Sequence, residues 1–113
     1  MSPDVGGLGA TPDQYATVVA AVAEDCGSTA MVYLMHLSAA NVLAAATPTG
    51  HPDVLGELAS GNKLGTLALS EKGSRSHFWA PVSSLEVADG GRRLVAEKSW
   101  VTAANRAMSW WRR

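Results

Sequence analysis

Two residues near the C-terminal end have the types and spacing of a site for a flat heteroaromatic ligand. In Lys98-Ser99-Trp100-Val101-Thr102, an extended backbone would put Trp100 and Thr102 on one side, because successive side chains of a strand alternate. Trp100 would then offer a stacking plane, and Thr102 would offer a hydrogen-bond donor. An ordinary half-buried strand has the same pattern and, from these residues alone, is the more frequent case.

A second candidate is the polar stretch Gly73-Ser74-Arg75-Ser76. Its amides, hydroxyls and guanidinium could hold a phosphate group. The stretch matches neither a P-loop nor a dinucleotide-binding fingerprint, so a solvated turn is the main alternative. The chain also lacks a Gly-x-Ser-x-Gly elbow, which argues against hydrolase chemistry.

The three histidines, His36, His51 and His77, could serve as metal ligands or bases. No carboxylate or cysteine stands at ligand spacing from any of them, so we expect no metal site. Since His36 lies in an apolar stretch, it is more typical of a buried structural histidine. The single cysteine, Cys26, excludes an internal disulfide framework and a cysteine-rich zinc site.

The first part of the chain predicts three helices. Thr11-Pro12-Asp13-Gln14 has the pattern of a capping box with proline at the first helical position. Gly27 is expected to end this helix, and Ser28 to cap a second helix over about 29–46. A short third helix is expected over 52–60, closed by Gly61. The apolar positions of the first helix recur at helical spacing: Tyr15, Val18, Val19, Val22 and Cys26.

The second predicted helix carries no Asp, Glu, Lys or Arg, so a membrane span must be considered. No basic residue flanks it, and its many alanines drive insertion only weakly. We therefore expect a helix that packs between other helices, although the chain offers few neighbours to cover it.

After Gly61 the periodicity becomes that of strands. We expect strands over 64–69, 82–88 and 94–102, a polar loop over 71–81, and a hairpin turn at Asp89-Gly90-Gly91. Helices followed by antiparallel strands predict an α+β fold, with one part over 1–61 and a second over 62–113.

Composition and charge agree with this division. The 113 residues are 47% hydrophobic and 17% charged, which supports a packed core and argues against disorder. A net charge of −1 gives no general reason to bind nucleic acid. Residues 1–61 hold six Asp or Glu and no Lys or Arg, whereas 62–113 hold nine Lys or Arg and four Asp or Glu. Any anion site is therefore expected in the second part, and attraction between the two parts is an equal alternative. The chain does not open with a secretory signal, and we expect a cytoplasmic protein.

Taken together, the segments over about 15–104 resemble the acyl-CoA dehydrogenase family of flavoenzymes. Leu67-Ala68-Leu69-Ser70-Glu71 looks like the family's (S/T)E strand, and Leu58-Ala59-Ser60-Gly61 like the end of the helix before it. Lys98-Ser99-Trp100-Val101-Thr102 looks like the family's K-x-W-(I/V)-T strand. The resemblance implies paired antiparallel helices followed by the first strands of an antiparallel β-barrel-like domain.

The resemblance also implies FAD as cofactor and an acyl-CoA thioester as substrate, in fatty acid metabolism. Leu67, Leu69 and Ser70 would lie beside the flavin ring, and Ser76 would contact the pyrophosphate or the nearby end of the substrate. Trp100 would pack on the ring system, and Thr102 would hydrogen-bond near its reactive nitrogen.

Some positions depart from the family pattern. His77 replaces the usual acid of the loop, and Val95-Ala96 replaces the usual Asn-Gly turn. The family's catalytic glutamate belongs to a C-terminal helical domain that this sequence does not contain. The tail 105–113 also differs from the apolar strands that the family has there.

Three functions remain open at this point. One is a segment or short relative of the dehydrogenase, inactive alone, and a second is a non-catalytic binding or structural module. The weakest is a membrane-associated protein anchored by 29–46, with Trp110 and Trp111 in a basic tail. We expect a homo-oligomer or a complementing partner chain, and FAD bound weakly or not at all by the monomer.

Overall fold

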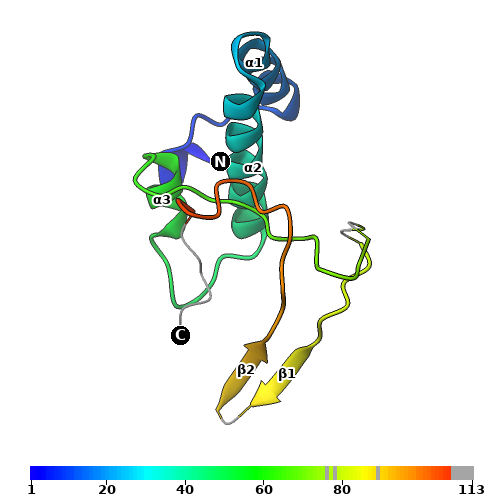
Figure 1. The fold of residues 1–113 in the computed structure, drawn as a ribbon. Coiled ribbons are helices and arrows are strands. Elements are labelled where there is room, and N and C mark those ends of the chain that lie inside the picture. Colours follow the sequence, from blue (N-terminus) through cyan, green and yellow to red (C-terminus); the bar gives the residue numbers. More distant parts are fainter. Residues whose placement is uncertain (76, 78, 89, 108–113) are drawn as a thin grey trace. The chain divides into compact units, whose positions relative to one another are not determined.

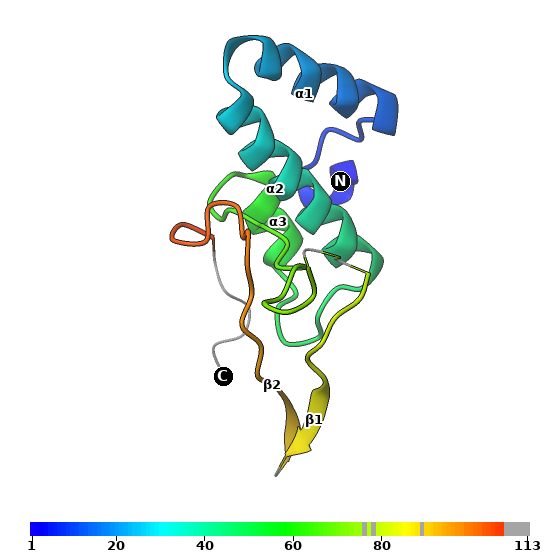
Figure 2. The ribbon, with the colours of Figure 1, turned by 45° about the vertical axis from the view of Figure 1, so that its right-hand side comes forward.

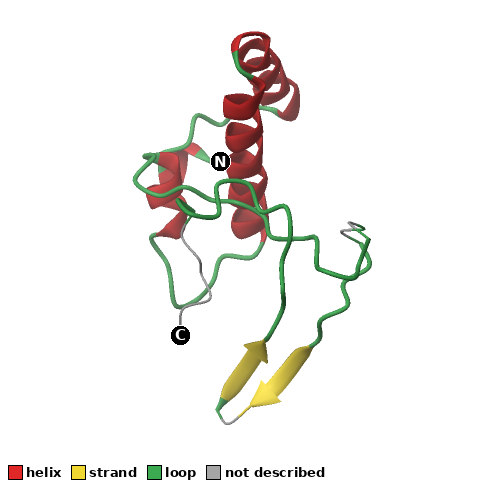
Figure 3. Ribbon diagram, viewed as in Figure 1, coloured by secondary structure: helices red, strands yellow, loops and turns green. Residues whose placement is uncertain are grey.

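A computed structural model describes residues 1–75, 77, 79–88 and 90–107. The described elements are a 3-10 turn η1 (Pro3–Val5), helices α1 (Pro12–Asp25), α2 (Gly27–Ala45) and α3 (Val54–Ala59), and strands β1 (Leu85–Ala88) and β2 (Gly91–Leu94) (Figures 1 and 3). The predicted α+β class is confirmed. The sheet is an open antiparallel pair, so the described strands form no barrel.

The chain divides into two compact units. The helical unit comprises Met1–Leu67 and Thr102–Arg113, and the hairpin unit comprises Ala68–Val101. Within the helical unit, α2 packs against both α1 and α3, and α3 contacts η1 (Figure 2).

The start of α1 confirms the predicted capping box. The Gln14 backbone N–H donates to the Thr11 hydroxyl, and the Thr11 N–H donates to the Gln14 side chain at 2.8 Å. Two N–H groups that the helix leaves without partners are satisfied in this way. Tyr15, Val19 and Val22 are half-buried, whereas Val18 is exposed, so the apolar face of α1 is narrower than predicted.

The junction between α1 and α2 differs from the prediction, because one residue serves both helices. The Cys26 N–H donates to the Val22 carbonyl and closes α1, while the Cys26 carbonyl accepts from Ala30 and opens α2. Gly27 is therefore the first residue of α2 and not the end of α1. Ser28 lies inside α2 and makes no cap.

Helix α2 is long and apolar enough to cross a membrane by length and composition. A single helix with these properties is weak support for a membrane location, because core helices of soluble proteins share them. Three of its alanines are buried, Ala30, Ala39 and Ala40, while Met31 and Val42 are about half exposed. The predicted shortage of neighbours around this helix is thus visible in the helical unit.

The core of the helical unit lies between α2 and α3. Ala40, Val54 and Leu58 form a buried cluster. The backbone at Gly65 passes close to Ala39 of α2. A Cβ at position 65 would lie 2.9 Å from the Ala39 Cβ, so this close contact requires glycine.

The hairpin unit contains the only regular strands of the described chain: β1 is shorter than the predicted strand over 82–88, and β2 begins at Gly91, before the predicted strand over 94–102. Leu85 pairs with Leu94 and Ala88 pairs with Gly91, which leaves a two-residue loop. Gly90 has φ +80°, as such a tight turn requires, and Asp89 lies outside the described residues.

Two predicted strands are wrong. Residues 64–69 form no strand, since the described chain gives them no ladder of backbone hydrogen bonds. Of the strand expected over 94–102, only Leu94 belongs to a strand, and Lys98 makes an isolated bridge with Glu71. Trp100 then adopts φ +58°, which an extended chain does not have, and 102–106 form turns.

We expect the purified chain to self-associate, because each unit exposes large apolar side chains. Val87 in the hairpin unit is 91% exposed, and both edges of its two-stranded sheet are open. Sedimentation at several concentrations, with and without FAD, measures this. Since Cys26 is exposed, Cys26→Ser is the control against a disulfide-linked dimer. A monodisperse monomer at all concentrations would show that these surfaces need no partner.

Candidate functional site

The two segments that carry the family resemblance lie against each other in the hairpin unit. The Ser99 N–H donates to the Ser70 carbonyl, and the Lys72 N–H donates to the Glu97 carbonyl, each at 2.9 Å. These contacts join residues that are 25 to 29 positions apart in the sequence. Ser70 and Trp100 are therefore brought to neighbouring positions of one small unit.

The centre of this arrangement is the carboxylate of Glu71, which is 3% exposed. Its Oε1 accepts from Lys98 Nζ at 2.6 Å, and its Oε2 accepts from the N–H groups of Val82 and Ser83 at 2.8 and 2.7 Å. One buried carboxylate thus ties together three stretches: the segment at 71, the end of the loop at 82–83, and the segment at 98.

Ser74 closes a tight turn at the start of the loop after Glu71. The Ser74 hydroxyl donates to the Glu71 carbonyl at 2.8 Å, and its oxygen lies 3.2 Å from the Glu71 backbone N–H. Ser74 is itself buried. Its side chain therefore shapes the turn and is not presented to an anion, contrary to the phosphate hypothesis for this residue.

These contacts determine the charge state of Glu71. The ammonium of Lys98, followed by the Ser83 and Val82 N–H groups, lowers the pKa of Glu71 to about 2 although burial opposes the shift. Hydrogen bonds to the charged form favour ionisation. Glu71 is therefore a carboxylate at neutral pH with both oxygens occupied, and it is poorly suited to act as a general base.

An exposed surface remains beside this anchor. Trp100 is 82% exposed and Leu69 is 45% exposed, while Ser70 is half-buried. An exposed indole offers a plane for a flat ring, and Leu69 and Ser70 of the same unit carry an apolar side chain and a hydroxyl. The part of the expected flavin contacts that lies in the hairpin unit thus has suitable chemistry for that ring.

The remaining predicted contacts fall outside the hairpin unit or outside the described residues. Leu67 and Thr102 belong to the helical unit, and both are half-buried. The alternation that would put Trp100 and Thr102 on one side of a strand is absent, because the backbone turns at Trp100. Ser76 lies outside the described residues, as do Trp110 and Trp111.

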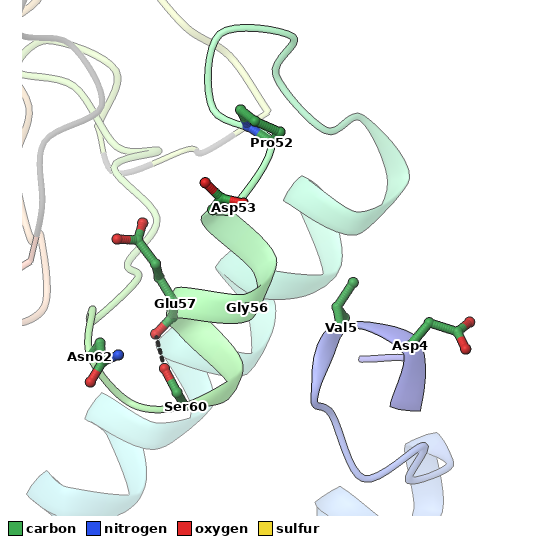
Figure 4. Close-up of a pocket in the computed structure, with 8 residues that line it drawn as sticks. All are labelled: Asp4, Val5, Pro52, Asp53, Gly56, Glu57, Ser60 and Asn62. Atoms are coloured by element: carbon green, nitrogen blue, oxygen red, sulfur yellow. Dashed lines mark hydrogen bonds between the residues drawn. The ribbon is translucent and has the colours of Figure 1, made fainter.

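A separate hollow of about 450 Å³ lies in the helical unit between η1 and α3 (Figure 4). Three carboxylates line it, Asp4, Asp53 and Glu57, and Glu57 is ion-paired with Lys63. Of the described residues expected to contact a flavin, none is among those that line this hollow. Among the described residues, no cluster of His, Cys, Asp or Glu has the arrangement of a metal site.

The sequence patterns did not predict the roles of Glu71 and Lys98, because each residue stands out only as part of a motif. A carboxylate and an amine 27 residues apart, one in each of the two paired motifs, were the available signal. Comparison with known proteins adds no further assignment: no protein family, curated protein or solved structure matches the chain.

Proposed function

We propose that this chain is a segment or short relative of the FAD-dependent acyl-CoA dehydrogenases, and that its hairpin unit forms part of a flavin site. The observation that carries the proposal is the pairing of Ser70-Glu71-Lys72 with Glu97-Lys98-Ser99. The sequence resemblance rests on two motifs that are far apart in the chain, and a common cofactor site requires them to meet.

Within this proposal, each residue of the hairpin unit has a distinct task. Trp100 provides the plane on which the isoalloxazine ring stacks, and Leu69 covers its edge from water. Ser70 supplies polar groups to the pyrimidine side of the ring, where fixed donors stabilise negative charge. When bound, the flavin supplies hydride acceptance, which is the chemistry that no side chain of this protein can provide.

The substrate in this proposal is an acyl-CoA thioester, and the setting is cytoplasmic. Abstraction of the α-proton requires a base within hydrogen-bond reach of that proton. Glu71 does not serve, because Lys98 and two backbone N–H groups occupy its carboxylate. We propose that a further domain or a complementing chain supplies the base, in a homo-oligomer or a mixed assembly.

A non-catalytic binding module is the second candidate, and the occupied Glu71 carboxylate favours it. Both candidates predict that the chain alone shows no dehydrogenase turnover. Purified chain with FAD, an acyl-CoA and a dye acceptor is expected to reduce the dye no faster than the same mixture without protein. Steady dye reduction that depends on the chain would contradict this prediction, and its persistence in Glu71→Gln would exclude Glu71 as the base.

The cofactor assignment is tested separately by titrating FAD with the chain and following flavin fluorescence. Stacking on Trp100 is expected to quench the fluorescence in a saturable way. Because only part of the pocket is assembled, we expect weak binding that does not survive gel filtration. Flavin fluorescence that stays constant up to the highest protein concentration would contradict the assignment.

A further inference from the structure

Helix α2 makes one polar side-chain contact with a distant segment of the helical unit. The backbone N–H of Gly65 donates to Nδ1 of His36 at 3.1 Å, across 29 positions of sequence. Gly65 is buried, and its close approach to Ala39 leaves no room for a Cβ. Among the described residues, this is the only hydrogen bond between a side chain and the stretch 64–66.

This contact is possible in one protonation state of the imidazole. A ring nitrogen accepts a hydrogen bond only when it carries no proton, so the neutral ring must hold its proton on Nε2. Protonation of the ring would put a second N–H against the Gly65 N–H. Two donors would then face each other, and the buried Gly65 N–H would lose its partner.

We propose that His36 is a pH-sensitive clasp, which holds residues 64–66 on α2 when the imidazole is neutral and releases them when it is protonated. Histidine is the side chain that ordinarily changes charge between about pH 5 and 8, so this is the interval over which the contact is tested. The stretch it releases leads directly into Leu67, but the clasp itself does not depend on flavin binding.

No ion pair joins His36 to an acidic residue in the described part of the chain, and the other titratable side chain on its own helix is Tyr33. Helix α2 has no Asp, Glu, Lys or Arg. The titratable residues on the elements that pack against α2 are Asp13, Tyr15, Glu24 and Asp25 of α1 and Glu57 of α3, with Lys63 in the segment that follows. Glu57 is ion-paired with Lys63.

The clasped stretch has little else of a polar kind to hold it. The Thr66 hydroxyl, one residue beyond Gly65, is buried and has no hydrogen-bond partner among the described residues. A buried hydroxyl without a partner already disfavours this position of the chain. Loss of the His36 contact would therefore remove the one polar interaction that offsets this cost.

The test is NMR of the intact chain between pH 8 and 5. The ¹⁵N resonances of His36 should show an unprotonated Nδ1 and a protonated Nε2 at pH 8. Amide exchange at Gly65, corrected for the intrinsic rate at each pH, should speed up by roughly tenfold as the ring becomes protonated. In His36→Asn, Oδ1 can accept the same hydrogen bond without titrating, so Gly65 should stay protected at pH 5.

His51→Asn is the matched control, since it removes a histidine from the loop before α3 and should leave the Gly65 transition unchanged. A proton on Nδ1 at pH 8 would overturn the proposal even if His36→Asn failed to fold. Protection of Gly65 that is equally high at pH 8 and pH 5 in the unsubstituted chain would overturn it as well.

Discussion

Glu71→Gln is expected to loosen the hairpin unit while leaving the helical unit folded. A glutamine can still accept from Val82 or Ser83, but its amide cannot neutralise Lys98 and presents N–H groups to a site where donors already converge. Amide exchange over 82–99 should speed up by about tenfold or more, because an unmade hydrogen bond to a buried charged group is costly.

The matched control is Glu97→Gln in the same unit. Glu97 also pairs with a lysine, Lys72, but both side chains are largely exposed and the contact is 3.2 Å long. Exposed ion pairs contribute little to stability, so this variant should leave amide exchange within about twofold of the original. Equal effects of the two substitutions would show that burial at Glu71 does not matter.

Lowering the pH tests the role of the Glu71 carboxylate in a second way. Because its pKa is lowered from 4.5 to about 2 in the folded unit, Glu71 stabilises that unit fully above about pH 4.5. That contribution is lost as the pH falls from 4.5 towards 2. The hairpin amides should lose protection over this interval, whereas Glu71→Gln should remove this pH dependence. A hairpin that is equally protected at pH 5 and pH 2 would contradict the assigned role.

Trp100→Ala is expected to weaken FAD binding by about tenfold or more. Stacking of a flat heterocycle on an aromatic side chain contributes about 1–3 kcal/mol, and the Trp100 side chain is largely exposed. Fluorescence titration of FAD measures the change. Trp79→Ala is the matched control, because Trp79 is also exposed in the hairpin unit but stacks on His77, outside the paired motifs.

The outcome depends on the difference between the two tryptophans. We expect Trp79→Ala to leave FAD affinity nearly unchanged. If both substitutions weaken binding equally, the flavin recognises exposed aromatic surface in general. If Trp100→Ala has no effect, the role taken from the family resemblance is wrong for this residue.

Local patterns predicted the helices well because their signals lie within a few residues. The capping box at Thr11 and Gln14 is a contact between neighbours, and it is present. The junction at Cys26 was missed because glycine can begin a helix as well as end one. Here a single residue closes α1 with its N–H and opens α2 with its carbonyl.

The strands were harder to predict because each depends on a partner elsewhere in the chain. Residues 64–69 have the composition of a short apolar strand, yet Gly65 instead packs against α2 and donates to His36. The turn at Trp100 likewise has no local signal, since a tryptophan with positive φ is uncommon. The family resemblance of the two motifs implied that the segments at 67–71 and 98–102 contribute to one site. It did not imply that Glu71 and Lys98 join these segments.

The most direct test of the flavin proposal is the mapping of FAD onto the backbone amides of the chain by NMR, with ADP as the reference ligand. We expect saturable amide shifts with FAD at Leu69, Ser70, Ser99 and Trp100. ADP should not produce these shifts, because it lacks the isoalloxazine ring on which Trp100 is proposed to stack. Equal shifts with ADP, shifts confined to the hollow at Asp53 and Glu57, or no saturable shift at millimolar FAD would contradict the proposal.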